Sequence, residues 1–515
     1  MILGALLLQF WSRYLPSPWA VLVGDDWANL ARSSFFASNA EAAWRGLQDP
    51  NRPLSMIAVN VVYRWFGDRA LPWTILSLAG NSLLLLFTMK MALELTGRRM
   101  VAALTGLFFA LLPNLTETYH WSTQVLNEVA CALVPYALSG WMWVAYVRRG
   151  GRWRLAVSAL AYGVGVFSYE AGILLPAAYL VLLPWKRTPV RSLLRMAPIG
   201  LAGLFYLAWR GTNAFGLNPG ISYPTHMQAG PSLMSITMNS WHLVHWWAGD
   251  YLFGAILSGF QMFASISLWT RRFLFVANVG VAGLVFWGLQ RLAESSTESE
   301  DTALFSRWQI WGFALAWTAA AMGVLILSYT GGRLNVIPGI GVSLLAALAL
   351  SNFPVRRWGP WLALPVFLAL VANQGTAENW RQSGIFARRL YAHLEETADQ
   401  WREKPILLLD TRTLRQRRTP GLLRPVGEDQ TTWALYGNSL LLRGFVPIGM
   451  VQLITGEKNH GIQVLLDVEY GARIDGDQLR WHARHNPARL FVNSMDEVFL
   501  VDAFVAGQMK SGGDH

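Results

Sequence analysis

The sequence predicts a polytopic α-helical membrane bundle with interfacial helices on its outer face and a C-terminal soluble α/β or α+β domain. Of its 515 residues, 53% are hydrophobic and 14% are charged, whereas soluble domains carry about 25% charged residues. Apolar segments near the length of a membrane span, about 20 residues, recur as far as residue 372. The 26 tryptophans suit aromatic belts at the two membrane interfaces.

The apolar segments predict about 11 spans, with a range of 11 to 13. The candidates are residues 1–21, 73–95, 101–116, 124–147, 153–168, 170–184, 192–209, 272–290, 309–328, 335–352 and 356–372. Two further stretches, 53–66 and 241–269, are expected to be interfacial or re-entrant helices. Residues 251–269 are nevertheless long enough to span.

Basic residues in short loops predict the orientation, because such loops stay in the cytoplasm. Four basic loops are expected there, with the N-terminus: 98–99, 148–154, 186–195 and 356–357. The same count places outside the first loop (22–72), residues 210–271, the turn at 331–333 and the C-terminal part. Arg271 and Arg272 fit this scheme poorly, because they fall at an outer boundary.

The composition changes after residue 372, so a transmembrane domain (1–372) and a soluble extracytoplasmic domain (373–515) are expected. Within the second domain, residues 381–403 have the pattern of an amphipathic helix. A buried strand is predicted at 404–410, and further strands are predicted at 463–468, 490–492 and 498–501.

The net charge of +11 is explained by basic loops and by attraction to anionic lipid head groups. The chain has no basic motif with a known docking geometry on nucleic acid. Membrane lipids are therefore expected partners, and nucleic acid is not. Cys131 is the only cysteine, which excludes a disulfide within the chain and a cysteine-based metal site.

Asp25 and Asp26, followed by Trp27, are charged residues close to a predicted membrane span, and the predicted topology does not explain them. A charge near the bilayer is costly and persists where it has a function or a partner. One aspartate suits the N-cap of a helix expected at 27–48. Adjacent like charges raise each other's cost of ionisation, so a pair needs a further reason. The sequence predicts one capping and one functional carboxylate and leaves their order open.

Arg52 lies between Pro50 and Pro53 in the same outer loop. The residue before a proline is held in an extended conformation. Its guanidinium is expected either to point into the outer cavity or to snorkel to the membrane interface.

Glu117, His120 and Trp121 follow the third predicted span, and Glu128 lies just inside the next. His120, Gln124 and Glu128 are four residues apart, so on one helix they share a face. A polar stripe of this kind is typical of a cavity lining, and a plain interfacial loop is the alternative.

Glu170, preceded by Tyr169, lies between two apolar runs. A carboxylate in this position is expected to face the bundle interior or an outer aqueous cavity. The alternative is a structural acid paired with a buried arginine, for which Arg210 is the candidate. Arg333 is an outward arginine that departs from the positive-inside trend, and a guanidinium binds phosphate through two parallel hydrogen bonds.

Carboxylates and arginines that open outward over an apolar bundle favour group transfer from a lipid-linked donor. A carboxylate can act as general base towards an acceptor hydroxyl. An arginine can stabilise the growing charge of a phosphate leaving group.

These motifs, in this order, resemble the membrane glycosyltransferases with the C-type (GT-C) fold, which include protein O-mannosyltransferases and the aminoarabinose transferase of lipid A. The resemblance covers about residues 1–350. It rests on the acidic pair, Arg52-Pro-Leu-Ser, the segment 168–176 and the segment 332–341. The chain departs from the pattern at Tyr169, where Lys or Arg is frequent, and at Leu334 and Asn335, where Tyr is commoner.

The resemblance implies an inverting glycosyltransferase that moves a sugar from a polyprenyl-phosphate donor to an acceptor glycan, lipid or protein. The expected location is the extracytoplasmic face of a bacterial inner membrane. Asp25 or Asp26 is then the general base or the residue that positions the acceptor. Some relatives bind a divalent cation, such as Mg or Mn, at the acidic pair, and others need none. Arg333, Arg52 and Arg210 are expected at the donor phosphate. The expected cavity residues are Trp27, Glu117, His120, Trp121, Glu128, Tyr169 and Glu170. A glycan ligase, or a flippase or transporter of lipid-linked glycans, is the alternative.

Overall fold

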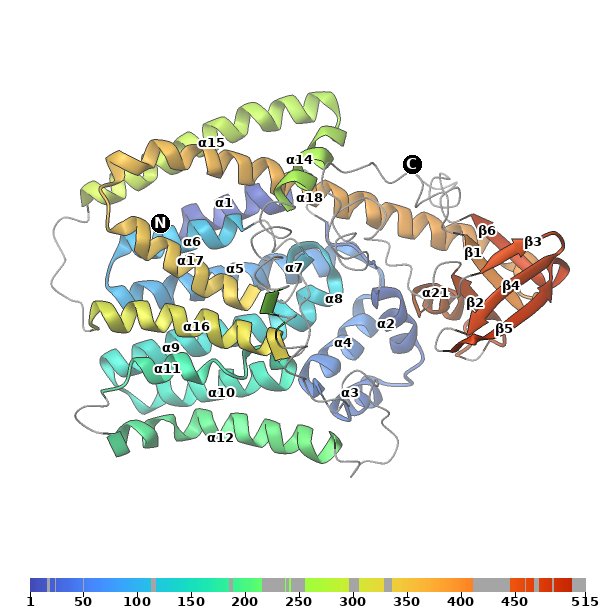
Figure 1. Ribbon diagram of the computed structural model, residues 1–515, viewed down its shortest axis with the longest axis horizontal. Helices are drawn as coiled ribbons and strands as arrows, with labels where there is room; N and C mark the ends of the chain where they lie inside the picture. The colour runs from blue at the N-terminus through green and yellow to red at the C-terminus, as the bar shows by residue number, and fades with distance from the viewer. Residues whose placement is uncertain are drawn as a thin grey trace.

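The protein is described here by a computed structural model (Figure 1), whose helices run side by side along its longest axis. It describes residues 1–15, 19–23, 25–49, 51–112, 117–184, 189–214, 237, 240–241, 255–295, 305–327, 336–410, 445–458, 460–466, 472–483 and 486–502. Small β-sheets lie at one end of the molecule, and α2, α3 and α4 lie between them and the main bundle.

Each apolar stretch predicted as a span contains a helix. These helices are α1 (Ile2–Tyr14), α5 (Ala70–Thr96), α6 (Arg99–Leu111), α9 (Val134–Arg149), α10 (Arg152–Ser168), α11 (Pro176–Val181), α12 (Pro189–Ala214), α15 (Leu268–Ser295), α16 (Arg307–Leu327), α17 (Val336–Ser351) and α18 (Val355–Glu396). Four described segments are long and apolar enough to cross a membrane: Ala70–Thr96, Ser122–Arg149, Ser192–Gly211 and Leu268–Glu294. The total of about 11 spans stays a prediction.

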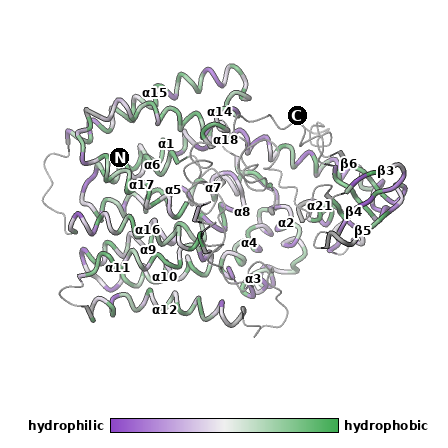
Figure 2. The backbone as a smooth tube through the Cα atoms, viewed as in Figure 1, coloured by the Kyte–Doolittle hydropathy of each residue, from purple (hydrophilic) through white to green (hydrophobic). Residues whose placement is uncertain are grey.

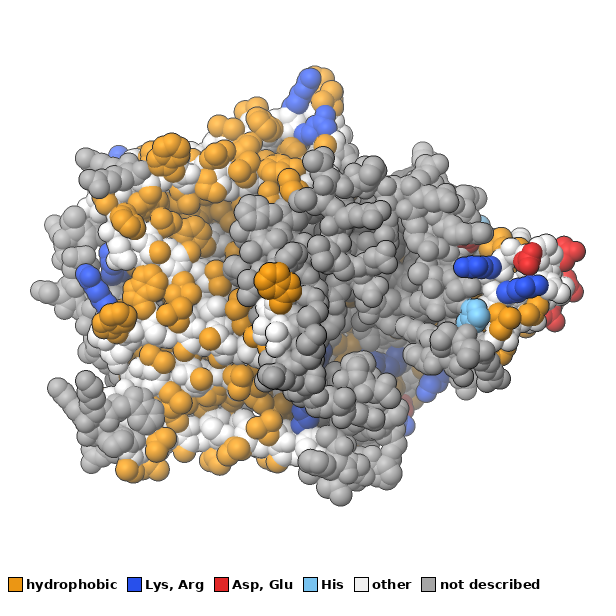
Figure 3. All heavy atoms as spheres, in the orientation of Figure 1, with side chains coloured by type: hydrophobic (Ala, Val, Ile, Leu, Met, Phe, Trp, Pro, Cys, Tyr) orange, Lys and Arg blue, Asp and Glu red, His pale blue; other side chains and the backbone are white. Residues whose placement is uncertain are grey.

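The outer surface of the bundle is apolar. Hydrophobic residues dominate the bundle helices (Figure 2) and cover much of the visible bundle surface (Figure 3). On α12, Leu204 and Phe205 are 63% and 66% exposed. Large apolar patches on a protein surface mark contact with a partner or with lipid, and helices of this length suit lipid.

The predicted first outer loop (22–72) contains two helices where the sequence predicted one at 27–48. They are α2 (Asp25–Ser34) and α3 (Asn39–Leu47). Ser38 caps α3, because its Oγ accepts the Glu41 N–H at 3.1 Å. The Glu41 carboxylate in turn accepts the Ala37 N–H at 2.9 Å. This reciprocal cap starts a new helix in the middle of the predicted one. The helix expected at 53–66 is confirmed as α4 (Pro53–Phe66).

Helix α18 is continuous across residue 373, the boundary predicted between the two domains. Its apolar first part therefore joins the amphipathic helix predicted at 381–403 without a break. That predicted helix ends earlier, at Glu396, and the short α19 (Ala398–Trp401) follows. The division into two domains stays a prediction.

Two glycines permit α18 to cross α14 (Ala255–Ser265) at close range. A Cβ placed on Gly375 would overlap the carbonyl oxygen of Gly259 and lie 2.7 Å from the Phe263 nitrogen. Small residues allow this backbone approach between membrane helices.

Replacing Gly375 with leucine is therefore expected to destabilise the protein by at least about 1–3 kcal/mol, the usual effect of overpacking. The measurement is the melting temperature of the purified protein in detergent. Gly283→Leu on α15 is the control, because a Cβ there has no described atom within 4 Å. Equal melting temperatures for both variants would contradict the close crossing.

The C-terminal part contains two three-stranded sheets. A parallel sheet has the order β2-β1-β6 and an antiparallel sheet the order β3-β4-β5. The strands are β1 (Ile406–Asp410), β2 (Gln463–Leu466), β3 (Arg473–Asp475), β4 (Gln478–Ala483), β5 (Asn486–Ser494) and β6 (Val498–Asp502); α21 (Phe445–Thr455) precedes β2 and η9 (Met495–Glu497) precedes β6. The four predicted strands are confirmed by β1, β2, β5 and β6.

The C-terminal part packs directly on α2 and α4. One buried apolar cluster joins Trp27 and Tyr63 to Leu390, Trp401 and Leu407. A Cβ on Gly449 of α21 would lie 2.8 Å from the Ala28 Cα of α2. Helix α2, which begins with the acidic pair, is therefore packed against α21 of the C-terminal part.

Candidate active site

Glu170 lies at the centre of a cluster formed by three distant segments of the chain. The Arg52 guanidinium donates to it through Nε at 3.1 Å and Nη2 at 3.4 Å. Arg210 lies on α12, and its Nη1 is 3.6 Å from Glu170 Oε1. The pairing of Arg210 with Glu170 that the sequence suggested is therefore present. Arg52 provides a second and closer partner that sequence reasoning did not assign.

A break in the helix pattern places Glu170 at this point. Helix α10 ends at Ser168, Tyr169 is extended (φ −161°, ψ 115°) and η3 (Glu170–Gly172) is a short 3₁₀ turn. Pro176 starts α11 at the position where a missing N–H is tolerated. Irregular backbone at membrane depth occurs where protein or a cavity surrounds it.

Two tyrosines bind the carbonyls that the break leaves without helical partners. Tyr136 OH donates to the Tyr169 carbonyl at 2.5 Å, and Tyr162 OH donates to the Ile173 carbonyl at 2.7 Å. The Tyr136 ring fits because Gly165 and Gly172 face it; a Cβ on either would clash with the ring. Specific hydrogen bonds and close packing therefore stabilise the break between α10 and α11.

Arg52 is positioned by the turn that starts α4. The Asp49 carboxylate accepts the N–H groups of Asn51 and Arg52 at 2.9 and 2.7 Å. Tyr206 OH donates to the Asn51 carbonyl at 3.2 Å and accepts from Arg210 Nη1 at 3.2 Å. The backbone of Arg52 (φ −140°, ψ 55°) is not fully extended as the sequence predicted. It turns the guanidinium towards Glu170.

The cluster retains hydrogen-bond donors for an anion. Among the described residues, Glu170 engages only Nε and Nη2 of Arg52, and a guanidinium carries five donor hydrogens. The Arg52 and Arg210 side chains are 33% and 32% exposed, so a ligand can reach them. The Arg52 guanidinium also lies 3.9 Å over the Tyr169 ring. Burial alone would lower the pKa of Arg52, but the Glu170 carboxylate raises it above its ordinary value.

Asp26 has a structural role, because its carboxylate is buried and accepts several hydrogen bonds. It is fully buried, and its Oδ2 accepts the Val23 N–H at 2.9 Å. Its Oδ1 accepts the Thr123 N–H at 2.9 Å and the hydroxyls of Thr123 and Tyr63. A carboxylate with this many donors ties the start of α2 to α4 and to the segment at 121–125.

Asp25 is the first residue of α2, and its side chain lies outside the described residues. Trp27, expected in the cavity, is 3% exposed and stacks on Tyr391 with ring centroids 5.0 Å apart. Trp27 therefore packs at the seam with the C-terminal part.

The predicted polar stripe His120, Gln124, Glu128 does not lie on one α-helix. Helix α7 (Glu117–His120) ends before Trp121, which pairs with Val21 as an isolated parallel bridge. A short α8 (Ser122–Gln124) and the π-helix η2 (Val125–Leu133) follow. Val134 N–H bonds to the Val129 carbonyl, five residues back. Pro135 has no N–H for a regular helical bond, which favours this wider turn.

The residues of this segment are buried. His120 is fully buried, and its Nε2 donates to the Arg13 carbonyl at 2.8 Å. Burial lowers the pKa of His120 to about 4, so the ring is neutral. Trp121 is fully buried and stacks on Trp380. Glu128 is 4% exposed and acts electrostatically on Arg52. Glu128 is thus the residue of this segment whose charge acts on the Glu170 cluster, through Arg52.

Besides the side chain of Asp25, two expected positions lie outside what the structure describes: Arg333 in full, and the side chain of Glu117. Among the described residues, no group of three His, Cys, Asp or Glu side chains could hold a metal ion. The oxygens of Asp26 already accept protein hydrogen bonds, so Asp26 does not fit the role of a cation ligand.

Sequence reasoning missed Tyr63 and Thr123, which hold Asp26, and Tyr206, which joins Arg210 to the Arg52 turn. Tyr206 and Arg210 are four residues apart on one helix, so their shared face was readable from the spacing. The contacts of Tyr63 and Thr123 with Asp26 span 37 and 97 residues and leave no local signal.

Comparison with known proteins gives no match to a protein-family model or to a curated protein. Two solved structures are similar to the chain: ArnT from Cupriavidus metallidurans in the apo state and the same protein bound to undecaprenyl phosphate. The first has 15% identity and a TM-score of 0.32, and covers 79% of this chain and 81% of that chain. The second has 14% identity and a TM-score of 0.34, and covers 89% of this chain and 88% of that chain. TM-scores this low carry no conclusion about the fold or activity of this chain.

Proposed function

We propose that this protein is a membrane glycosyltransferase that takes a sugar from a polyprenyl-phosphate donor and transfers it to an acceptor glycan, lipid or protein. The observation that carries the proposal is the cluster in which Glu170 orients Arg52 and Arg210 at a break between bundle helices. Oriented guanidiniums with donors to spare suit a phosphate group.

The surroundings of the cluster suit a donor with a lipid tail. Arg210 lies near the C-terminal end of α12, whose Leu204, Phe205 and Leu207 are more than half exposed. A polyprenyl chain is apolar and lies favourably against such a helix face. Its phosphate would then meet Arg52 and Arg210 at the end of that face. Arg333 is the third arginine we assign to the donor phosphate.

Asp25 is the residue we assign as general base, because Asp26 is engaged in holding α2. In a single displacement, the Asp25 carboxylate accepts the proton of the acceptor hydroxyl while the acceptor oxygen bonds to the anomeric carbon. The bond from that carbon to the phosphate oxygen breaks, and the electron pair leaves with polyprenyl phosphate. The product has inverted anomeric configuration. The arginines stabilise the charge that grows on the leaving phosphate.

The direct test supplies polyprenyl-phosphate donors with labelled sugars to membranes with and without this protein. We expect a labelled glycosylated product and free polyprenyl phosphate only when the protein is present. Movement of an intact lipid-linked glycan, or joining of a whole glycan without transfer of a single sugar, would favour the flippase or ligase alternative.

The proposal places the site and the C-terminal part on the extracytoplasmic side of a bacterial inner membrane. A phosphatase reporter fused after residue 400 is therefore expected to be active. The control is a fusion after residue 150, in a loop that the basic residues place in the cytoplasm; this fusion should be inactive. The reverse pattern would overturn the orientation.

A further inference from the structure

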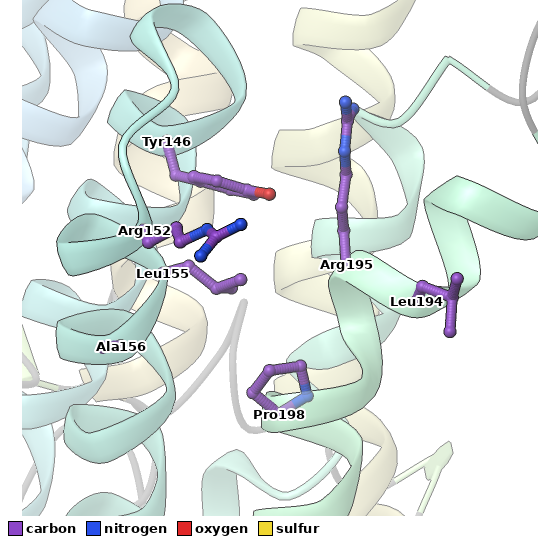
Figure 4. Close-up of a pocket in the computed structure, with 7 residues that line it drawn as sticks. All are labelled: Tyr146, Arg152, Leu155, Ala156, Leu194, Arg195 and Pro198. Carbon is purple, nitrogen blue, oxygen red and sulfur yellow. The ribbon is translucent and has the colours of Figure 1, made fainter.

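A cavity of about 510 Å³ opens between α9, α10 and α12. Tyr146 and Arg152 extend from one wall, and Arg195 lies on the other (Figure 4). The apolar part of the lining includes Leu155, Ala156 and Pro198. None of these residues belongs to the Glu170 cluster.

The cavity lies at the opposite end of the bundle from Glu170. Helix α10 runs from Arg152, in the cavity, to Ser168, two residues before Glu170. At 1.5 Å per residue this helix is about 25 Å long. Helix α12 carries Arg195 in the cavity and Arg210 in the cluster, which are about 22 Å apart along the axis by the same rise. The hydrocarbon core of a bilayer is about 30 Å thick, so the two sites lie near opposite membrane faces.

The neighbouring residues place the cavity at a membrane interface. Trp153 is 58% exposed, and Arg154 lies 4.7 Å over its ring. Leu194, at the rim of the cavity, is 66% exposed. Exposed tryptophan is typical of the head-group level, and exposed leucine suits the acyl chains beside it.

The lining has the chemistry of a phosphate site next to an acyl chain. Among the described residues, no carboxylate forms an ion pair with Arg152 or Arg195. By contrast, the nearby Arg149 is bound to Glu94 at 2.6 Å. Two arginines and a phenol hydroxyl supply donors for phosphate oxygens. The apolar wall suits the first carbons of a lipid chain.

We infer that this cavity binds the phosphate head group of an anionic phospholipid. Basic pockets between membrane helices on the cytoplasmic side bind such head groups, and the basic loops place this end of the bundle there. A volume of this size is in the usual range for a small-ligand site. The lipid would join α12 to α9 and α10 at the end remote from Glu170. This inference does not depend on the proposed transfer reaction.

The test is lipid retention by the full-length protein. The protein is reconstituted in nanodiscs of phosphatidylcholine with a minor fraction of phosphatidylglycerol, released, and analysed by native mass spectrometry. We expect retained phosphatidylglycerol, and about a tenfold or larger loss of it in the Arg152→Gln, Arg195→Gln double variant. Arg99→Gln is the matched control, because Arg99 is an exposed arginine at the same end of the bundle, outside the cavity. It should retain the lipid as the unmodified protein does.

A second variant tests the cavity without a change of charge. Ala156→Trp fills the space from an exposed position and should also abolish retention. Equal retention in all variants, or equal loss in Arg99→Gln, would overturn the inference. A third arm uses phosphatidylcholine nanodiscs with inorganic phosphate. Phosphate binding that matches that of phosphatidylglycerol would mean that the site takes the free ion, and would overturn the lipid assignment.

Discussion

Replacing Arg52 with methionine is expected to reduce sugar transfer from a polyprenyl-phosphate donor by about 100-fold or more while the protein stays folded. Removal of one preorganised donor to a developing charge costs about that much in turnover. Arg52 is one-third exposed and directly precedes α4, so methionine keeps most of its packing. The measurement is turnover of labelled donor, together with the melting temperature of the purified protein.

The controls distinguish two roles of Arg52: binding of the donor phosphate, and a purely structural ion pair with Glu170. Arg64→Met changes the charge on the same helix at a site where the side chain donates a hydrogen bond to the Ala37 carbonyl and, among the described residues, does not contact the Glu170 cluster; it should leave transfer unchanged. Glu170→Gln leaves both arginines in place and should reduce transfer less than Arg52→Met. If Arg52→Met lowers the melting temperature but leaves donor affinity and turnover intact, the cluster is structural and the phosphate role is wrong.

The two aspartates are expected to respond in opposite ways to replacement by asparagine. Asp25→Asn should reduce transfer by about 100- to 10,000-fold with an unchanged melting temperature, as expected for loss of a general base. Asp26→Asn should destabilise the protein by about 3 kcal/mol. It removes the charge from a buried carboxylate that accepts hydrogen bonds from Val23, Thr123 and Tyr63. Both variants are compared by turnover and by thermal unfolding.

Tyr63→Phe is the matched check on Asp26, because it removes one hydroxyl donor and keeps the ring. It should lower stability less than Asp26→Asn and should not abolish transfer. Full activity of Asp25→Asn would contradict the assignment of the base. A stable but inactive Asp26→Asn would move the catalytic role to Asp26.

Much of the fold was predictable from local pattern. The apolar stretches, the helix at 53–66 and the strands at 406–410, 463–466 and 498–502 are where the sequence predicts them. These elements are specified by residues close in the chain, through run length and composition. The prediction was wrong where short-range signals competed: Ser38 and Glu41 start a new helix at α3, and Pro135 favours a π-helix.

The candidate site was predictable in its residue types but only partly in its pairings. The ion pair of Glu170 with Arg210, which the sequence offered as the alternative reading, is present; both are polar residues at the ends of apolar runs. The closer partner of Glu170 is Arg52, which lies 118 residues away in the chain. The two prolines around Arg52 give no indication that its side chain lies next to Glu170 in the fold.

By itself, the sequence determined that this chain forms an apolar helical bundle with polar residues concentrated at particular helix ends. Only the tertiary structure decided that Asp26 is the buried structural carboxylate and that Arg52 and Arg210 share Glu170. The physical reason is that hydrophobic length and periodicity act within one helix. A carboxylate's environment, by contrast, depends on which donors the packing of several helices brings within about 3 Å.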